Sequence, residues 1–296
     1  MKPEKIQLSE EERRTLQLNE VQLLLEVYRI CSKYRIRYSL DGGTLLGAAR
    51  HRGFIPWDDD ADVVFLREEY EKFYAACQRD LDQERFFLQD YRTDAEYRWG
   101  YAKLRLKGTE FVRVGQEHMK YRTGVCIDIF VLDRVSDSNF VRRWDYFQLF
   151  CIRKALYSEL GKVAADSWPL RLWYHLLNFI PKGALFGWRN HIARKHQAKD
   201  TQLVSHYLWP YNDRCRFGMP AHCFDSYTTL EFEGMQFSVM GGYDEYLTIF
   251  YGDYMTPPPP ERRCGPGEAS KIELLPITLE DIHREYRLVQ RQLRVE

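Results

Sequence analysis

Residues 42–65 read GGTLLGAARHRGFIPWDDDADVVF and hold the most informative pattern of the chain. The Gly-Gly pair follows an expected strand over residues 36–40 and precedes a short helix, Thr44 to Arg50. An acidic run then leads directly into an apolar strand, Ala61 to Leu66. Four carboxylates within five residues repel one another, and a solvated acidic loop would not normally continue into such a strand. These acids are therefore expected to serve a binding site.

The acidic run has the geometry of a divalent-cation site. Residues two apart in a strand share a face, so Asp60 and Asp62 are expected to point the same way, joined by Asp58 if the extended backbone begins earlier. Asp128 lies in the apolar run VCIDIFVLD, where a buried carboxylate needs a partner or a metal, and a neighbouring strand could bring it alongside. We expect Asp58, Asp60, Asp62 and Asp128 to bind Mg²⁺ or Mn²⁺. The alternative is that Asp58 and Asp59 cap a turn while Asp128 pairs with an arginine.

Gly42, Gly43 and Thr44 are the expected contacts for a phosphate group. Glycines allow a phosphate to approach the backbone, and the start of a helix offers unpaired N–H groups. The Thr44 hydroxyl could add a further donor. A plain turn is the ordinary alternative for a Gly-Gly pair.

Cationic side chains near the glycines and acids are further candidates for phosphate binding. Arg50 and Arg52 lie between the glycines and the acids, where they could clamp phosphates or form salt bridges with the acids. Lys103 and Arg105 are two apart on an expected strand and share a face. Lys103 is assigned to the donor site, although a solvated basic face is the alternative for at least one of this pair.

The rest of the chain predicts an α/β (α+β) fold. Ser9 and Glu12 form a capping-box pattern that opens a helix running to about Tyr34. Alternating and apolar runs predict further helices and strands around the acidic stretch, the pattern of a compact α/β core. The remaining expected elements are a helix over 67–78, strands over 86–91, 97–106 and 124–132, a hairpin over 228–240, a short helix within 242–255 and a final helix over 279–294.

Changes in composition divide the chain into three expected parts: a catalytic core with the N-terminal helix (1–135), a helical acceptor or lid region (136–200), and a C-terminal part with the hairpin and terminal helix (201–296). The helical region carries an aromatic stripe with basic neighbours. Core packing is the ordinary interpretation of such a stripe; contact with a membrane surface or a lipid-linked acceptor is the alternative. The stripe comprises Trp168, Trp173, Phe179, Phe186 and Trp188, beside Arg171, Lys182 and Arg189.

Composition limits the classes of function. The 43 Lys and Arg residues balance 43 acidic ones, which argues against non-specific electrostatic binding of nucleic acid by the chain as a whole. No segment approaches the roughly 20 apolar residues of a membrane span, and the charged N-terminus does not resemble a secretory signal. Seven scattered cysteines predict a reduced, cytoplasmic protein. The set His206, Cys215, His222 and Cys223 fits no standard zinc-finger spacing.

The blocks GGTLLGAARHRGFIPWDDDADV, YAKLRLKGTEF, CIDIFVLD, FEGMQFSV and GYDEYLTIFYGDYMTPPP strongly resemble the LicD family, over about residues 20–260. That family includes bacterial phosphorylcholine transferases, and fukutin-type proteins are relatives. It is similar to the nucleotidyltransferases of the DNA polymerase β type, which implies a mixed-sheet core here. Ala61 replaces a larger aliphatic residue and VMGG a Pro-containing stretch, but neither change removes a carboxylate.

The resemblance implies a magnesium-dependent phosphotransferase. Its donor would be CDP-activated, its transferred group phosphorylcholine or an alditol phosphate, and its acceptor a glycan or lipid-linked glycan of lipopolysaccharide, teichoic acid or capsule. Gly43 and Thr44 occupy the family's glycine turn, Asp60 and Asp62 its metal pair, and Asp128 its third acid. The expected location is the cytoplasm, with peripheral contact at the inner face of the membrane as an option. Transfer of NMP itself, or non-catalytic glycan binding, remains the alternative.

Overall fold

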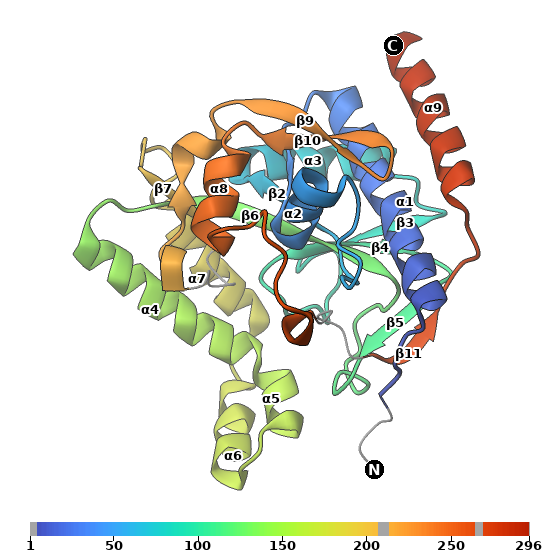
Figure 1. Cartoon of the computed structure of the whole chain (residues 1–296). Helices are drawn as coiled ribbons and strands as arrows, with labels where there is room; N and C mark the ends of the chain where they lie inside the picture. Colours follow the sequence, from blue (N-terminus) through green and yellow to red (C-terminus); the bar gives the residue numbers. More distant parts are fainter. Residues whose placement is uncertain (1–4, 207–212, 264–268, 296) are drawn as a thin grey trace.

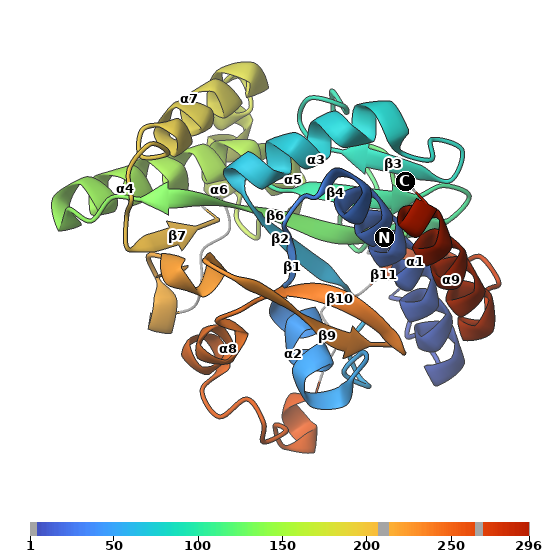
Figure 2. The same ribbon diagram turned by 90° about the horizontal axis from the view of Figure 1, so that it is seen from above.

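The protein is described here from a computed structural model that covers residues 5–206, 213–263 and 269–295. Its centre is a mixed sheet with the strand order β1–β2–β6–β4–β3 (Figures 1 and 2). Strands β2 and β6 are parallel, and their neighbours pair antiparallel to them. The bounds are β1 Ser39–Leu40, β2 Asp62–Leu66, β6 Cys126–Val135, β4 Ala102–Leu106 and β3 Phe86–Gln89. The mixed α/β class is confirmed.

Helices cover both faces of this sheet. Figure 2 shows α1 (Glu10–Tyr34) and α3 (Arg67–Asp80) on one side, with α9 (Leu279–Val295) packed against α1. On the other side lie α2 (Gly42–His51), α8 (Tyr243–Tyr251) and the hairpin of β9 (Tyr227–Phe232) and β10 (Met235–Met240). The predicted capping box is present, since the Ser9 hydroxyl accepts from the Glu12 backbone N–H and the Glu12 carboxylate accepts from the Ser9 N–H.

Short strands complete the fold around this core. Strands β7 (Leu203–Ser205) and β8 (Met219–Pro220) extend the sheet at the far end of β6. A separate two-stranded sheet joins β5 (Glu110–Arg113) to β11 (Ala269–Glu273). The β9–β10 hairpin is tied to β1, because the Ser39 hydroxyl accepts from the Met240 N–H at 3.0 Å. The C-terminal part therefore packs on the same core as the acidic stretch.

Four helices lie between β6 and β7: α4 (Asn139–Leu156), α5 (Ser158–Ala164), α6 (Trp168–Leu177) and α7 (Lys182–Arg194). Helices α5 and α6 project away from the sheet, towards the bottom of Figure 1. A second, small apolar cluster holds α4 and α7 together through Leu149, Ile152, Leu185 and Ile192. No helix among residues 5–206, 213–263 and 269–295 is both long and apolar enough to span a bilayer.

Three expectations from the sequence need correction. The strand after α1 is limited to Ser39–Leu40, and the acidic strand begins at Asp62 rather than Ala61. A turn closed by the Asp58 N–H and the Ile55 carbonyl, 2.9 Å apart, precedes the extended backbone, and the Ala61 carbonyl already accepts a hydrogen bond from the Asp128 N–H. Asp60 therefore precedes the strand, although its charge still acts on the Asp62 carboxyl group.

The other two corrections concern burial. Lys103 and Arg105 do not form a solvated basic face, because β4 is covered by neighbouring structure and leaves these side chains 6% and 5% exposed. The aromatic stripe is not core packing: of its members only Phe186 is buried, whereas Trp168 is 76% exposed.

Candidate functional site

Parallel pairing of two apolar strands builds the acidic site. Asp62 opens β2 and stands in direct register with Asp128 on β6. The Asp128 N–H donates to the Ala61 carbonyl at 3.0 Å, and the Asp62 N–H donates to the Thr44 hydroxyl at 2.8 Å. Ahead of the strand, carboxylate oxygens of Asp58, Asp59 and Asp60 come within 4.8 Å of one another. The acids that the sequence separates by 66 residues thus lie together.

Mutual repulsion and lost hydration weaken the acidity of this cluster. Burial, followed by the charge of Asp60, raises the pKa of Asp58 to about 8. Burial and the charge of Asp128 raise the pKa of Asp60 to about 6. The pKa of Asp62 is raised well above its usual value by burial and by Asp60 and Asp128. A group of carboxylates this crowded is poised to exchange protons for cations.

The start of α2 faces the acids. Gly42 has a left-handed backbone, φ 50°, and a Cβ there would lie 3.1 Å from Asp62 Oδ2. A Cβ at Gly43 would lie only 2.5 Å from Asp58 Oδ2. Both glycines thus let the carboxylates approach the helix N-terminus, whose partial positive charge favours anions. The predicted phosphate contacts Gly42, Gly43 and Thr44 lie beside the predicted metal ligands.

Cations border the acids on the opposite side. The Lys103 ammonium pairs with Asp128 across β4 and β6, and this carboxylate raises the lysine pKa although burial opposes the charge. Arg113 on β5 behaves alike: burial lowers its pKa, but the charges of Asp128 and other nearby groups outweigh that effect. Lys103, which the sequence assigned to a phosphate, therefore has a carboxylate partner in this structure.

The two arginines of α2 lie at its far end. Arg50 donates from Nη1 to the Tyr254 carbonyl at 2.6 Å, which ties α2 to the segment after α8. Arg52 ends the helix in a left-handed conformation with φ 57°. Because ten helical residues separate this end from Asp41, by roughly 15 Å at 1.5 Å per residue, Arg52 is remote from the start of α2. Its role in phosphate binding stays a prediction.

Three site residues escaped the sequence reasoning. Glu20 of α1 is 3% exposed, its Oε2 has no hydrogen-bond partner among the described residues, and burial with the charge of Asp60 raises its pKa. Asp41, before α2, is buried and accepts a hydrogen bond from the Tyr246 hydroxyl at 2.6 Å. Burial, followed by the charges of Asp41 and Asp62, raises the pKa of Tyr251. An acid inside an otherwise buried helix was the signal that could have revealed Glu20.

The residues present fit a hard divalent cation. Their donors are carboxylate oxygens, which Mg²⁺ and Mn²⁺ prefer, and the buried Oε2 of Glu20 has no hydrogen-bond partner within the described part of the chain. Asp58, Asp60, Asp62 and Asp128 would hold the ion. The charge of Lys103 offsets Asp128, and the charge of Arg113 acts on both Asp60 and Asp128.

Thermal unfolding should reveal this site through its pH dependence. Unfolded aspartates have pKa values of about 3.9, whereas the fold raises those of Asp58 and Asp60. The folded state therefore binds more protons, and the metal-free cluster loses stability as the pH rises from about 4 to about 8. We expect Mg²⁺ to raise Tm more at pH 8 than at pH 5, since ions compete with protons for the carboxylates.

The control for this measurement is the double substitution D58N/D60N, which keeps both side-chain shapes. It should flatten the pH dependence and reduce the Mg²⁺ effect. Equal stabilisation by Mg²⁺ at both pH values, or an undiminished effect in the double variant, would contradict the metal assignment.

Substitution of Gly43 tests the predicted phosphate contact. A valine there would displace the Asp58 carboxylate and fill the space at the start of α2. Because Gly43 has no left-handed backbone, the fold itself should tolerate the change. We expect donor affinity to fall at least about tenfold, a cost of about 1.4 kcal/mol, with little change in Tm. A large loss of stability with unchanged donor affinity would favour the plain turn.

A cavity of about 270 Å³ adjoins the acids and reaches α4 and α5. Lys103, Arg113 and Cys126 line its inner side, and Arg153, Leu156 and Leu160 line the side formed by the helices. Aromatic rings complete the lining: Trp99, Tyr101, Phe111, Tyr121 and Tyr157. A pocket of aromatic and cationic side chains suits an anionic ligand with flat or ring-shaped parts.

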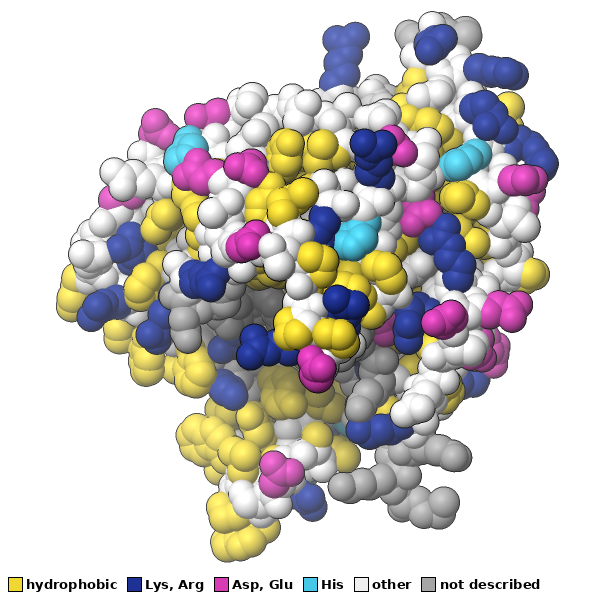
Figure 3. Space-filling model, viewed as in Figure 1, with side chains coloured by type: hydrophobic (Ala, Val, Ile, Leu, Met, Phe, Trp, Pro, Cys, Tyr) yellow, Lys and Arg dark blue, Asp and Glu magenta, His cyan; other side chains and the backbone are white. Residues whose placement is uncertain are grey.

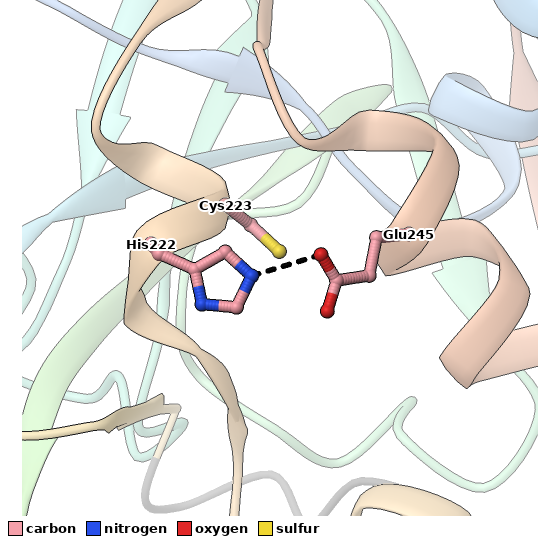
Figure 4. A group of neighbouring side chains, drawn as sticks. All are labelled: His222, Cys223 and Glu245. Atoms are coloured by element: carbon pink, nitrogen blue, oxygen red, sulfur yellow. Dashed lines mark hydrogen bonds and ion pairs between the residues drawn. The ribbon is translucent and has the colours of Figure 1, made fainter.

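A second cluster of possible metal ligands lies on the C-terminal part (Figure 4). The His222 Nε2 atom lies 2.8 Å from Glu245 Oε2, and the Cys223 sulfur points towards this pair, with all three donor atoms within 4.8 Å of one another. His222 and Glu245 are largely exposed, whereas burial and the charge of Glu245 raise the pKa of Cys223 to about 11. A thiol that resists ionisation beside an exposed ion pair is no more than a weak metal site.

Comparison with known proteins finds similarity to one family. The family model described as LicD/FKTN/FKRP, nucleotidyltransferase domain, matches residues 35–172. The lipopolysaccharide cholinephosphotransferase LicD of Haemophilus influenzae is 29% identical over 267 residues, covering 84% of this chain and 93% of that protein. The human ribitol 5-phosphate transferase FKRP is 37% identical over 65 residues, covering 21% of this chain and 13% of that protein.

Proposed function

We propose that the protein moves a phospho-substituent from a CDP-activated donor to a hydroxyl of a cell-surface glycan, because residues 35–172 match the LicD/FKTN/FKRP nucleotidyltransferase-domain model. The relative from H. influenzae is named a cholinephosphotransferase and FKRP a ribitol 5-phosphate transferase. Phosphorylcholine is therefore the first candidate for the transferred group, and an alditol phosphate is the second. The acceptor would belong to lipopolysaccharide, teichoic acid or capsule.

The observation that carries this proposal is the pairing of Asp62 with Asp128 across parallel strands, beside Asp58 and Asp60. This arrangement collects negative charge where a donor pyrophosphate, itself anionic, would have to bind. The acids and the pyrophosphate would repel each other unless divalent cations bind between them. A nucleotidyltransferase core of the DNA polymerase β type arranges its acids for that purpose, and we propose that subtype for the mixed sheet here.

The reaction needs no covalent intermediate. The acceptor hydroxyl oxygen forms a bond to the phosphorus that carries the substituent, the bond from that phosphorus to the bridging oxygen breaks, and CMP leaves with that oxygen. Asp128 is our candidate for receiving the hydroxyl proton. Bound Mg²⁺ would neutralise the pyrophosphate and stabilise the charge of the leaving oxygen. The backbone N–H groups at Gly42 and Gly43 and the Lys103 ammonium would position the phosphates.

The aromatic cavity is the proposed acceptor site. Its inner end reaches Lys103 and Arg113, next to the acids, so a hydroxyl held there would face the donor phosphorus. Aromatic rings such as Trp99 and Tyr121 suit the apolar faces of sugars, and the cationic lining favours a glycan that carries acidic or phosphate groups. The reaction would take place in the cytoplasm, where thiols such as buried Cys31 and Cys77 remain reduced.

A screen of CDP-linked donors for divalent-ion-dependent release of CMP tests this function directly. CDP-choline and CDP-ribitol should be compared with and without chelator, with the Asp62→Asn variant as the inactive reference. Release of CMP from one donor, restored by Mg²⁺ or Mn²⁺ after chelation, is expected. Failure to release CMP from any CDP-linked donor in the presence of acceptor would support a non-catalytic glycan-binding protein.

Mass analysis separates the remaining enzymatic alternative. A phosphotransferase adds only the phospho-substituent to the acceptor, whereas a nucleotidyltransferase adds the NMP group and releases a different product. The lining of the cavity favours neither reaction by itself. The names of the two relatives favour phospho-substituent transfer.

A further inference from the structure

The helices α4–α7 carry most of the exposed large apolar side chains of the described residues. Thirteen of sixteen such side chains lie between residues 140 and 188. Figure 3 shows them gathered at the lower left of the molecule, over the projecting helices. We call this set the apolar helical face: Phe140, Trp144, Phe147 and Phe150 of α4, Val163 of α5, Trp168, Leu170, Leu172, Trp173 and Leu176 of α6, and Phe179, Ile180 and Trp188. Contiguous apolar surface of this kind marks an interaction site.

Helix α6 shows that the exposure is not a by-product of core packing. Only Tyr174 of its ten residues is buried, and its ring lies against Gly161 of α5, where a Cβ would come within 2.5 Å of it. Five apolar side chains of α6 are exposed, with Trp168 76% exposed: Trp168, Leu170, Leu172, Trp173 and Leu176. Phe179, just after the helix, is 82% exposed. A helix this apolar with one buried side chain lacks a partner in the described fold.

The charge of the same region indicates what that partner is. Between Asn139 and Lys195 the chain carries ten Lys and Arg residues against three acidic ones, although the whole chain is neutral. Two of those acids are already paired: Asp145 with Lys195 and His196, and Glu159 with Lys162. The net positive charge is therefore available to anions outside the protein, and the basic residues Arg143, Lys154 and Arg171 are exposed.

We propose that the apolar helical face docks on an anionic phospholipid bilayer, with α6 and the segment around Phe179 inserted among the head groups. Exposed Trp and Phe side chains flanked by Lys and Arg are the signature of helices that lie in the membrane interface. A second copy of the chain would bring a face of the same charge against this one. A bilayer with anionic head groups supplies both the apolar depth and the opposite charge.

The position of the face connects docking to the cavity. The C-terminal end of α4 lines the cavity through Arg153, Leu156 and Tyr157. Phe147 and Phe150 of the same helix belong to the apolar helical face. A lipid-linked acceptor held in the bilayer would thus lie next to the wall of the cavity that the helices form. This link rests on the proposed function, whereas bilayer binding itself does not.

Vesicle co-sedimentation tests the proposal without donor or acceptor. The full chain should bind vesicles made of equal parts phosphatidylcholine and phosphatidylglycerol, bind phosphatidylcholine vesicles more weakly, and lose affinity as salt is raised. The double variant W168A/F179A should lose at least about tenfold in affinity, given the apolar surface that both side chains bury in the bilayer. Its Tm should match that of the wild type, because both side chains are mostly exposed.

The matched control is Leu288→Ala, which removes an exposed apolar side chain of α9 outside the face and should bind vesicles as the wild type does. Wild-type protein that ignores anionic vesicles, or a W168A/F179A variant that binds them undiminished, would overturn the proposal. The proposal would also be overturned if the wild-type protein sediments as a dimer and the W168A/F179A variant as a monomer, because the face would then serve self-association. Loss of CMP release with intact vesicle binding would count against the proposed function alone.

Discussion

Asp62→Asn is expected to lower turnover by roughly three orders of magnitude in a protein that remains folded. The substitution preserves the side-chain shape and the backbone N–H that donates to Thr44, but it removes one charge from the centre of the acidic site. A divalent ion contributes several kcal/mol to the stabilisation of transition-state charge, and each 1.36 kcal/mol corresponds to about a factor of ten in rate. Turnover with a CDP-linked donor measures the effect.

The same variant should lose activity without losing stability. Asp62 is repelled by Asp60 and Asp128, which contribute to its raised pKa, so removing its charge should leave the Tm of the metal-free protein unchanged or higher. Asp200→Asn, at a fully exposed acid, is the matched control and should retain full turnover. Near-normal turnover in folded Asp62→Asn protein would eliminate Asp62 as a metal ligand.

Lys103→Met should be the second most damaging change, for a different reason. In the structure the Lys103 ammonium neutralises Asp128, and we propose that it turns to the donor phosphates once a cation occupies the acids. Methionine retains the length of the buried stem but has no charge. We expect turnover to fall about a hundredfold, in the range for loss of one pre-organised donor to a developing negative charge.

Metal binding distinguishes the role of Lys103 from that of the acids. Without the lysine, Asp128 lacks its partner, and breaking a buried ion pair costs about 3–5 kcal/mol of stability. Added Mg²⁺ should replace the missing charge, so it should raise the Tm of Lys103→Met by more than it raises the wild-type Tm. Lys107→Met, at the exposed residue that follows the same strand, should change neither quantity. A Lys103→Met protein that no longer responds to Mg²⁺ would contradict this division of roles.

The acid pair was accessible from sequence because its signal is local. Asp62 and Asp128 each interrupt an apolar run, and two such strands in one sheet have few ways to place their carboxylates other than together. Asp60 was expected within the strand but precedes it, since the turn between Ile55 and Asp58 leaves no mark in the alternation of residues. Local pattern therefore predicted the site but not its outline.

Residues brought in by tertiary contacts were beyond that reasoning. Glu20 and Tyr251 lie 231 positions apart in the chain and approach the acids only because α1 and α8 pack around the same sheet. Lys103 was expected at a phosphate, and its pairing with Asp128 became visible only once β4 lay beside β6. The exposure of Trp168 could not be decided, because apolar periodicity looks the same whether a helix packs on protein or on lipid.

Parallel pairing of β2 with β6 also constrains how the chain can be made. Parallel strands need a crossover, and here the segment between Leu66 and Cys126 must be in place before Asp62 can meet Asp128. Fragments that stop short of β6 would leave one edge of β2 unpaired. Heterologous expression should therefore favour the intact chain, and premature termination products should be targets for aggregation or proteolysis.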